Sequence, residues 1–350
     1  MSTRQAGPHL RFTNSVILIL LSVLVLTGVY GLFWNLNGWL YDLHRGAAWA
    51  LVAVVPFKVG ISWRSLKRGF SRTFNRSVMI GVSLTAAVLV FGVLILGLLW
   101  TWRIGPEVLW LGQSGIAWHW IAALILVPLV ALHVWRRWPK PKPGDFTLRR
   151  HALRALGFAG FGLVGWWLAE TVSQARATPQ SPRAFTGSRG YGSLTGNLFP
   201  VTGEWANPLD VAQWALTIHG AVAAERQLRY EDILAMAPLQ VEATIDCTNG
   251  WYSRQQWQGP SLMAVLDSLG LNDDAHFVRI KSSTGYAATF SLDEAREILL
   301  ATHVGGQPLD HWHGYPVRSV APSWRGWYWV KWVSDVEVLT VPHFDLPGII

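Results

Sequence analysis

The stretch Thr244-Ile245-Asp246-Cys247-Thr248-Asn249-Gly250-Trp251-Tyr252 contains the single cysteine of the 350-residue chain. A lone cysteine forms no intrachain disulfide, and this one stands close to a glycine and two aromatic residues. A thiolate is a soft ligand that suits zinc, copper(I), iron–sulfur clusters or a heavier redox metal. Zinc and iron–sulfur sites draw on several cysteines or histidines at short spacing, so the lack of a second cysteine argues against both.

Two further interpretations of Cys247 stay open from the local sequence. One is a buried free thiol, which is the common fate of a single cysteine. The other is a nucleophile activated by a histidine. The candidate partners in the same half of the chain are His276, His303, His311 and His313.

Composition separates the two halves of the chain. Hydrophobic residues make up 51% of the sequence and charged residues 14%, and the mean hydropathy is +0.26. Residues 1–175 contain 17 Lys and Arg against 4 Asp and Glu, whereas residues 176–350 contain 12 against 17. The basic charge therefore belongs to the apolar half, where membrane loops carry it, and it indicates no nucleic-acid surface.

Five apolar segments have about the 20 residues that a helix needs to cross a bilayer. We predict an all-α transmembrane bundle in residues 1–170, with helices near 14–34, 44–63, 77–100, 115–135 and 152–169. Tryptophans gather at the ends of these segments, where their rings favour the membrane interface. The first segment is too long for a signal peptide and is predicted to stay uncleaved.

Basic residues gather in alternate loops of the predicted bundle. The positive-inside rule therefore puts the N-terminus in the cytoplasm and the residues after about 170 outside, as expected for a multi-pass protein of a bacterial cytoplasmic membrane with a periplasmic domain. The basic positions are Arg4 and Arg11, then Arg64, Lys67, Arg68, Arg72 and Arg76, and finally Arg136, Arg137, Lys140, Lys142, Arg149 and Arg150.

Residues 171–200 are rich in small and polar residues and are predicted to be a linker that wraps a soluble domain at 201–345. Short strands and helices mixed along this domain indicate an α+β fold. Expected strands cover 214–219, 241–245, 277–281, 287–290, 328–333 and 336–340, and expected helices cover 229–236, 261–269 and 292–300.

Several motifs in this half resemble the sulfite oxidase-type molybdopterin oxidoreductases, in order along residues 185–345. Cys247-Thr248-Asn249-Gly250-Trp251, followed by Trp257-x-Gly259-Pro260, resembles the family's molybdenum-ligand segment. The further matching segments are Trp214–Gly220, Ser283–Tyr286, His313-Gly314-Tyr315-Pro316-Val317-Arg318 and Ala321-Pro322-x-x-Arg325-Gly326 with Trp329-Val330-Lys331-Trp332.

The resemblance implies a sulfite oxidase fold, a molybdopterin cofactor and oxygen-atom transfer at molybdenum. Cys247 would be the protein ligand of the metal, which accounts for a single cysteine. Planar guanidinium groups and a lysine suit the phosphate of the pterin, and the matching positions are Arg318, Arg325 and Lys331. His313 would either donate to the pterin or cap a turn, and Asn249 and Trp251 would contact the cofactor edge.

The chain departs from the sulfite oxidases in two places. Those enzymes follow the cysteine with basic residues that hold an anionic substrate, whereas Gly250, Trp251 and Tyr252 stand here. The aromatic surround favours a less charged or bulkier small-molecule substrate. A C-terminal immunoglobulin-like dimerisation domain is also not expected, so the domain resembles the monomeric members of the family.

The run Leu148-Arg149-Arg150-His151-Ala152-Leu153-Arg154 resembles a twin-arginine export signal. Because molybdopterin is inserted in the cytoplasm, a domain that works outside must cross the membrane already folded. We therefore predict twin-arginine export, and the alternative is a plain positive-inside anchor.

Histidines inside the apolar segments are costly and usually functional. His44 and His119 lie at similar depth and are predicted to be the ligands of a b-type haem, unless both are interface residues without a ligand. His133 follows His119 by fourteen residues and is a candidate for a second haem. The residue fourteen after His44 is Lys58, so the second haem would need another partner, His151 or His9.

The predicted protein is therefore a membrane-anchored molybdopterin oxidoreductase that exchanges electrons through haem b with a quinone or another redox partner. Two alternatives remain. One is a membrane electron-transfer protein whose soluble domain docks a redox partner. The other is a cofactor-free binding module in which Cys247 is a core residue.

Overall fold

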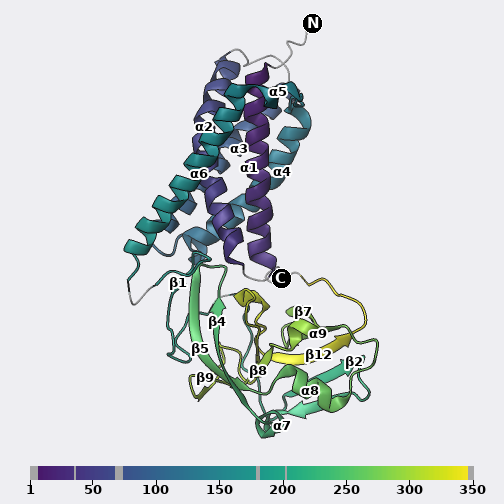
Figure 1. Ribbon diagram of the computed structural model, residues 1–350. Helices are drawn as coiled ribbons and strands as arrows, with labels where there is room; N and C mark the ends of the chain where they lie inside the picture. Colours follow the sequence, from purple (N-terminus) through teal and green to yellow (C-terminus); the bar gives the residue numbers. More distant parts are fainter. Residues whose placement is uncertain (1–6, 35–36, 68–73, 179–181, 202, 346–350) are drawn as a thin grey trace. The chain divides into compact units, whose positions relative to one another are not determined.

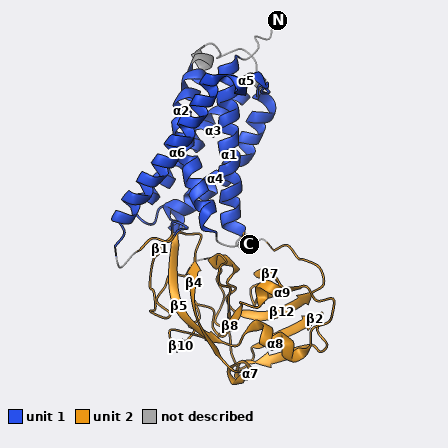
Figure 2. Ribbon diagram, viewed as in Figure 1, with its two compact units in different colours: residues 1–33, 37–179, 185–187 blue, residues 34–36, 180–184, 188–350 orange. Residues whose placement is uncertain are grey.

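The computed structural model describes residues 7–34, 37–67, 74–178, 182–201 and 203–345, so Arg4, Arg68 and Arg72 of the charge pattern lie outside the described residues. The chain forms two compact units. Unit 1 comprises 1–33, 37–179 and 185–187, and unit 2 comprises 34–36, 180–184 and 188–350 (Figure 2).

Unit 1 is a bundle of long helices that lie side by side (Figure 1). In the described part of this unit, five helices are long and apolar enough to cross a membrane, as predicted. They are α1 (Pro8–Phe33), α2 (Gly38–Lys67), α3 (Phe74–Thr101), α4 (Gly115–Arg137) and α6 (Arg149–Ala175), and a short α5 (Gly144–Thr147) precedes α6. Helix α1 packs on α2, α3 on α4, and α6 on α2, so the first four helices form two hairpins.

Unit 2 contains two five-stranded sheets and a two-stranded ladder. The first sheet has the order β3-β2-β12-β6-β7, with β2 and β12 parallel. Its strands are β2 (Ala215–Gly220), β3 (Arg226–Arg229), β6 (Phe277–Ser282), β7 (Ala287–Ser291) and β12 (Val333–Leu339). The helices of this unit are α7 (Tyr230–Ala235), α8 (Leu262–Leu269) and α9 (Leu292–Ala295).

The second sheet is built on the long hairpin of β4 and β5 (Figure 1). Its strands are β1 (Arg189–Gly190), β4 (Leu239–Asp246), β5 (Trp251–Gly259), β9 (His303–Val304) and β10 (Gln307–Pro308). Strand β1 runs parallel to the start of β5, pairing Arg189 with Trp251. The ladder joins β8 (Leu299–Ala301) to β11 (Arg318–Val320).

One hydrophobic core fills unit 2. Trp257, Trp329 and Phe290 are among its fully buried side chains. Helix α8 adds an apolar face, and it begins where Ser261 accepts a hydrogen bond from the Ala264 amide. Burial of each large side chain contributes about 1.5–3 kcal/mol of transfer free energy, so the turns around this core rest on a stable support.

Two sequence predictions for unit 2 need correction, and the long strand β5 was missed. The helix expected at 292–300 ends at Ala295, because Leu299–Ala301 is buried and pairs with β11 as a strand. The sequence does not separate the two, because a short apolar run is compatible with a helix or with a strand. The strand expected at 328–333 is instead a short 3-10 turn followed by an irregular buried segment. Strand β5 was not predicted, because the residues that alternate inward include the polar Ser253 and Gln255.

The segment expected to be a linker has regular structure at its start and in its second half. Helix α6 continues to Ala175, and Arg189–Gly190 forms β1 in the second sheet of unit 2. The amide of Arg189 donates to the Gly250 carbonyl, so β1 supports the turn that carries Cys247.

Candidate active site

Cys247 lies in the tight turn between β4 and β5. The Cys247 amide donates to the Trp251 carbonyl, and the Gly250 amide donates to the Cys247 carbonyl. Gly250 has φ +84°, which a side chain would strain, so this position favours glycine. The Asn249 amide points at Cys247 Sγ, 3.4 Å away, and a hydrogen bond from an amide favours the thiolate that a metal requires.

A buried ion pair holds this turn in place. Arg325 Nη1 lies 2.5 Å from Asp246 Oδ1, and the side chains are 8% and 5% exposed. Ser188 Oγ donates to the same carboxylate oxygen at 2.7 Å. The guanidinium charge of Arg325 is therefore already compensated, and Arg325 fits a role in positioning Cys247 better than the predicted role in phosphate binding.

Arg318 and Lys331 form a second buried basic group, without such compensation. They are 5% and 7% exposed. Arg318 donates to the His313 carbonyl, and Lys331 Nζ donates to the Glu204 carbonyl at 2.9 Å. Across the described ranges, no carboxylate lies within ion-pair distance of either side chain, and Arg318 Nε is buried without an acceptor.

The charges of Arg318 and Lys331 favour the binding of an anion. Burial lowers the pKa of Arg318 to about 10. Burial, followed by repulsion from Arg318, lowers the pKa of Lys331 to about 8. The negative charges of Glu204 and Cys247 oppose both shifts. Two buried cations without an ion-pair partner among the described residues, and an orphaned N–H, fit the phosphate of molybdopterin.

His313 is held on both sides. Its Nδ1 lies 2.7 Å from Asp310 Oδ1, and its Nε2 lies 3.0 Å from the Phe199 carbonyl. The side chain is 3% exposed. Of the two roles predicted for His313, this geometry favours a structural one, because both ring nitrogens have partners and its carbonyl holds Arg318.

Trp251 offers a further donor beside the turn. Its Nε1 is buried and has no hydrogen-bond partner among the described residues. Its ring centroid lies 6.0 Å from that of Phe199, whose ring also faces the Arg318 guanidinium at 6.0 Å. This arrangement fits the predicted contact with the cofactor edge.

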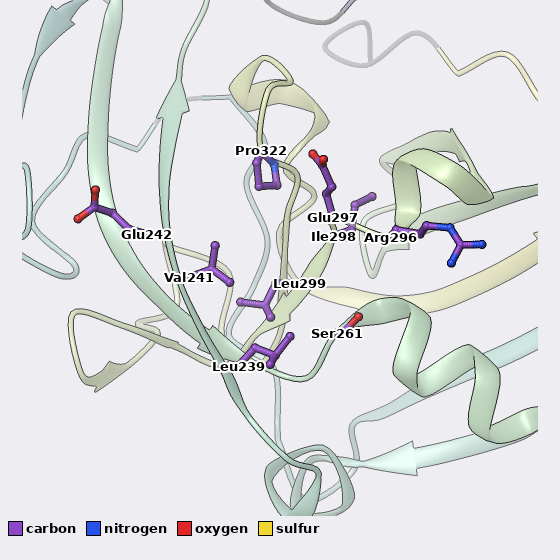
Figure 3. Close-up of a pocket in the computed structure, with 9 residues that line it drawn as sticks. All are labelled: Leu239, Val241, Glu242, Ser261, Arg296, Glu297, Ile298, Leu299 and Pro322. Carbon is purple, nitrogen blue, oxygen red and sulfur yellow. The ribbon is translucent and has the colours of Figure 1, made fainter.

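A separate apolar pocket of about 340 Å³ lies between β4, the start of α8 and residues 296–299 (Figure 3). Leu239, Val241 and Leu299 face its interior, whereas Arg296 points away. None of the predicted cofactor ligands lines this pocket.

Sequence reasoning missed four residues that shape the site. Asp246 and Ser188 anchor Arg325, and Phe199 and Glu204 accept hydrogen bonds from His313 and Lys331 through their carbonyls. Of these four residues, only Asp246 could have been found from the sequence, because a carboxylate directly before the candidate metal ligand Cys247 needs a partner. The carbonyl contacts depend on the backbone path alone and leave no pattern in the sequence.

Unit 1 brings His44 and His119 together. Their ring centroids are 6.2 Å apart and their planes are inclined by 69°. Two imidazoles that share one iron would have centroids about 6.2 Å apart, from two metal–nitrogen bonds of about 2 Å and two ring radii of about 1.1 Å. The spacing therefore fits a shared haem iron.

Hydrogen bonds orient both rings for such a role. Thr27 Oγ1 donates to the Val23 carbonyl and so accepts from His44 Nδ1 at 2.9 Å. His119 Nδ1 donates to the Val93 carbonyl at 2.8 Å. Each neutral ring thus keeps its Nε2 lone pair for a metal, which is the usual arrangement of a ligating histidine.

The third membrane histidine has no histidine partner in the described part of the chain. His133 Nδ1 lies 2.9 Å from Ser83 Oγ. His151, which the sequence offered as a partner, is buried and contacts His9 and the Asp145 carbonyl instead. A second bis-histidine haem therefore has no support.

Comparison with known proteins agrees with the site. Residues 203–345 match the family model described as "Oxidoreductase molybdopterin binding domain". An oxidoreductase of Bacillus subtilis, YuiH, is 29% identical over 41% of this chain and 76% of its own length. The protein-methionine-sulfoxide reductase catalytic subunit MsrP of Ralstonia nicotianae is 25% identical over 52% of this chain and 64% of its own. Human mitochondrial sulfite oxidase is 36% identical over 27% of this chain and 19% of its own.

These matches support a molybdopterin-binding oxidoreductase domain similar to that of the sulfite oxidases at residues 203–345. In its described residues, the same chain carries five helices that are apolar enough to cross a membrane.

Proposed function

We propose that this chain is a membrane-anchored molybdopterin oxidoreductase that exchanges electrons through a haem in its helical unit. The observation that carries the proposal is the presence, in one unit, of a partly exposed thiol and two buried cations that have no ion-pair partner among the described residues. When bound, molybdopterin supplies two-electron oxygen-atom transfer at molybdenum. Cys247 would hold the metal, and Arg318 and Lys331 would hold the phosphate.

The proposed substrate is a small, uncharged oxygen-atom donor or acceptor. The turn after Cys247 carries Gly250 and Trp251 where sulfite oxidases have basic residues. The nearby Arg254 is paired with Glu242 on the same hairpin and is exposed, so it adds no cation at the thiol. The name of the Ralstonia relative points to sulfoxides as one such class.

Metal analysis of the full chain tests the proposal. Protein purified from a host that makes molybdopterin should contain about one molybdenum per chain, and Cys247→Ser should lose it. Ser268→Ala is the matched control, because the Ser268 hydroxyl bonds only within α8 in the described structure. A wild-type protein without molybdenum contradicts the proposal. Protein that contains haem but no molybdenum would be an electron-transfer protein. Protein that contains neither haem nor molybdenum would be a binding module.

The proposed haem b is bound by His44 and His119, supported by the 6.2 Å spacing and the orientation of both rings. A haem would let the two electrons of the molybdenum reaction leave or arrive singly, in exchange with a quinone or another partner. Reduced-minus-oxidised spectra should show a b-type α-band that His119→Leu removes. Wild-type protein without this band contradicts the haem.

We further propose that the molybdopterin domain works on the periplasmic side and is exported by the twin-arginine route. Arg149 and Arg150 are exposed at the start of α6, where a targeting receptor can reach them. Replacing both by lysine should leave the first four helices inserted but keep the C-terminal domain inside. Protease access to that domain from outside in the double variant would exclude this route.

A further inference from the structure

The two helical hairpins of unit 1 carry matching residues at two levels. Fourteen residues span about 21 Å of helix and nearly four whole turns, so positions fourteen apart share a face. The histidine level consists of Gly28 and His44 in the first hairpin and Gly97 and His119 in the second. Stepping fourteen residues along each helix, away from this level, gives the polar level: Asn14, Lys58, Ser83 and His133.

The histidine level keeps space beside its imidazoles. A Cβ on Gly97 would lie 3.2 Å from two atoms of the His119 ring, and one on Gly28 would lie 3.5 Å from His44 Cε1. At the polar level, Asn14 and Ser83 occupy the positions that correspond to the two glycines. Asn14 Oδ1 accepts from Lys58 Nζ at 2.8 Å, and Ser83 Oγ bonds His133 Nδ1 at 2.9 Å.

Three of the four equivalent positions therefore differ, and only one histidine remains. The polar level lacks both the second imidazole and the glycines that leave room at the histidine level. It nevertheless keeps a lysine and a histidine at membrane depth, where such groups are costly and usually functional. Lys58 and His133 each lie fourteen residues from His44 and His119, whose rings are 6.2 Å apart, so they lie on the corresponding faces of α2 and α4.

Hydrogen bonding defines what this site offers a ligand. Ser83 Oγ donates to the Met79 carbonyl at 2.7 Å and so accepts from His133 Nδ1. The Nε2 atom of a neutral His133 is then an acceptor. Lys58 uses one of its three protons on Asn14 and keeps donors for a ligand oxygen.

The polar level is also open to lipid. His133 lies four residues before the end of α4, and Asn14 lies six after the start of α1, so the level is about 6–9 Å from the helix ends. Phe57 and Val59, on either side of Lys58, are 48% and 47% exposed. A ligand dissolved in the bilayer near its surface can therefore reach the site.

We propose that the polar level binds the headgroup of a lipid-soluble quinol. One quinol hydroxyl donates to His133 Nε2, and Lys58 donates to a ligand oxygen. This inference rests on the proposed function for its redox purpose, because a quinol is the two-electron partner that a bilayer supplies. It goes beyond that function in assigning the residues, and it excludes a second haem at this level.

Titration of the purified full chain with 2-heptyl-4-hydroxyquinoline N-oxide, a fluorescent quinol analogue, tests the site. Quenching of its fluorescence should saturate at one site per chain. Lys58→Met and His133→Gln should each weaken binding at least tenfold while the haem content stays unchanged. Thr85→Val is the control, since Thr85 is an exposed hydroxyl residue on the same helix as Ser83.

Haem content, measured as pyridine haemochromogen, separates this inference from the proposed haem. One haem per chain with binding that depends on both residues supports the site. A chain without haem whose analogue binding still depends on both residues supports the site and refutes the haem at His44. Two haems per chain, or a titration that neither variant alters, overturns the quinol site.

Discussion

Removal of the Asp246 charge should destabilise unit 2 strongly. The pair of Asp246 and Arg325 is buried on both sides, at 2.5 Å. Asp246→Asn keeps the shape but removes the countercharge that Asp246 gives the buried Arg325 guanidinium, and such a loss costs about 3–5 kcal/mol. For a unit of this size each kcal/mol lowers the Tm by about 2–4 °C, so the expected decrease is about 6–20 °C.

The same hairpin supplies a matched control. Arg254 and Glu242 approach to 3.6 Å, but their side chains are 55% and 45% exposed. Solvent screens such a pair, so Glu242→Gln should cost less than about 1 kcal/mol. Thermal unfolding of the purified full chain, followed by circular dichroism, measures both changes.

A double variant separates the lost pair from the orphaned charge. Asp246→Asn with Arg325→Met removes both charges, so it should recover part of the Tm that Asp246→Asn alone loses. Molybdenum content should fall in Asp246→Asn, because Asp246 directly precedes Cys247. The reasoning is refuted if Asp246→Asn lowers the Tm no more than Glu242→Gln does.

Three further predictions concern the cofactors. The pKa of Lys331 is lowered to about 8, so in cofactor-free protein the Lys331 ammonium group loses its proton as the pH rises through 8. Retention of molybdopterin on gel filtration should therefore fall by up to about tenfold per pH unit above pH 8. The Lys331→Arg variant, which stays charged, should retain molybdopterin at pH 9.5. Gly97→Ala places a Cβ 3.2 Å from His119 and should reduce haem content, whereas Gly92→Ala, which meets open space, should not. Trp251→Phe removes an orphaned donor and should weaken molybdopterin retention without lowering the Tm.

The sequence predicted the features that depend on periodicity and on spacing. Five apolar runs gave five helices, because a membrane span needs only length and composition. The strand predicted at 277–281 was found at Phe277–Ser282, where buried residues alternate with half-buried ones. Strand β5 was not predicted because the polar Gln255 side chain is buried. Its amide is hydrogen-bonded to the Gly192 carbonyl and the Gly196 amide, which lie far away in sequence.

The three basic residues predicted to bind the pterin phosphate show a similar limit of sequence-based prediction. Arg318, Arg325 and Lys331 looked equivalent as basic residues on matching motifs, since a sequence does not show which cation already has a countercharge. The fold decides this by placing Asp246 and Ser188 against Arg325, while Arg318 and Lys331 donate to carbonyl oxygens and have no ion-pair partner among the described residues. A buried cation without an ion-pair partner still favours an anion, whereas a paired one does not. These contacts favour Arg318 and Lys331 as the proposed phosphate ligands, and they favour a positioning role for Arg325 through Asp246.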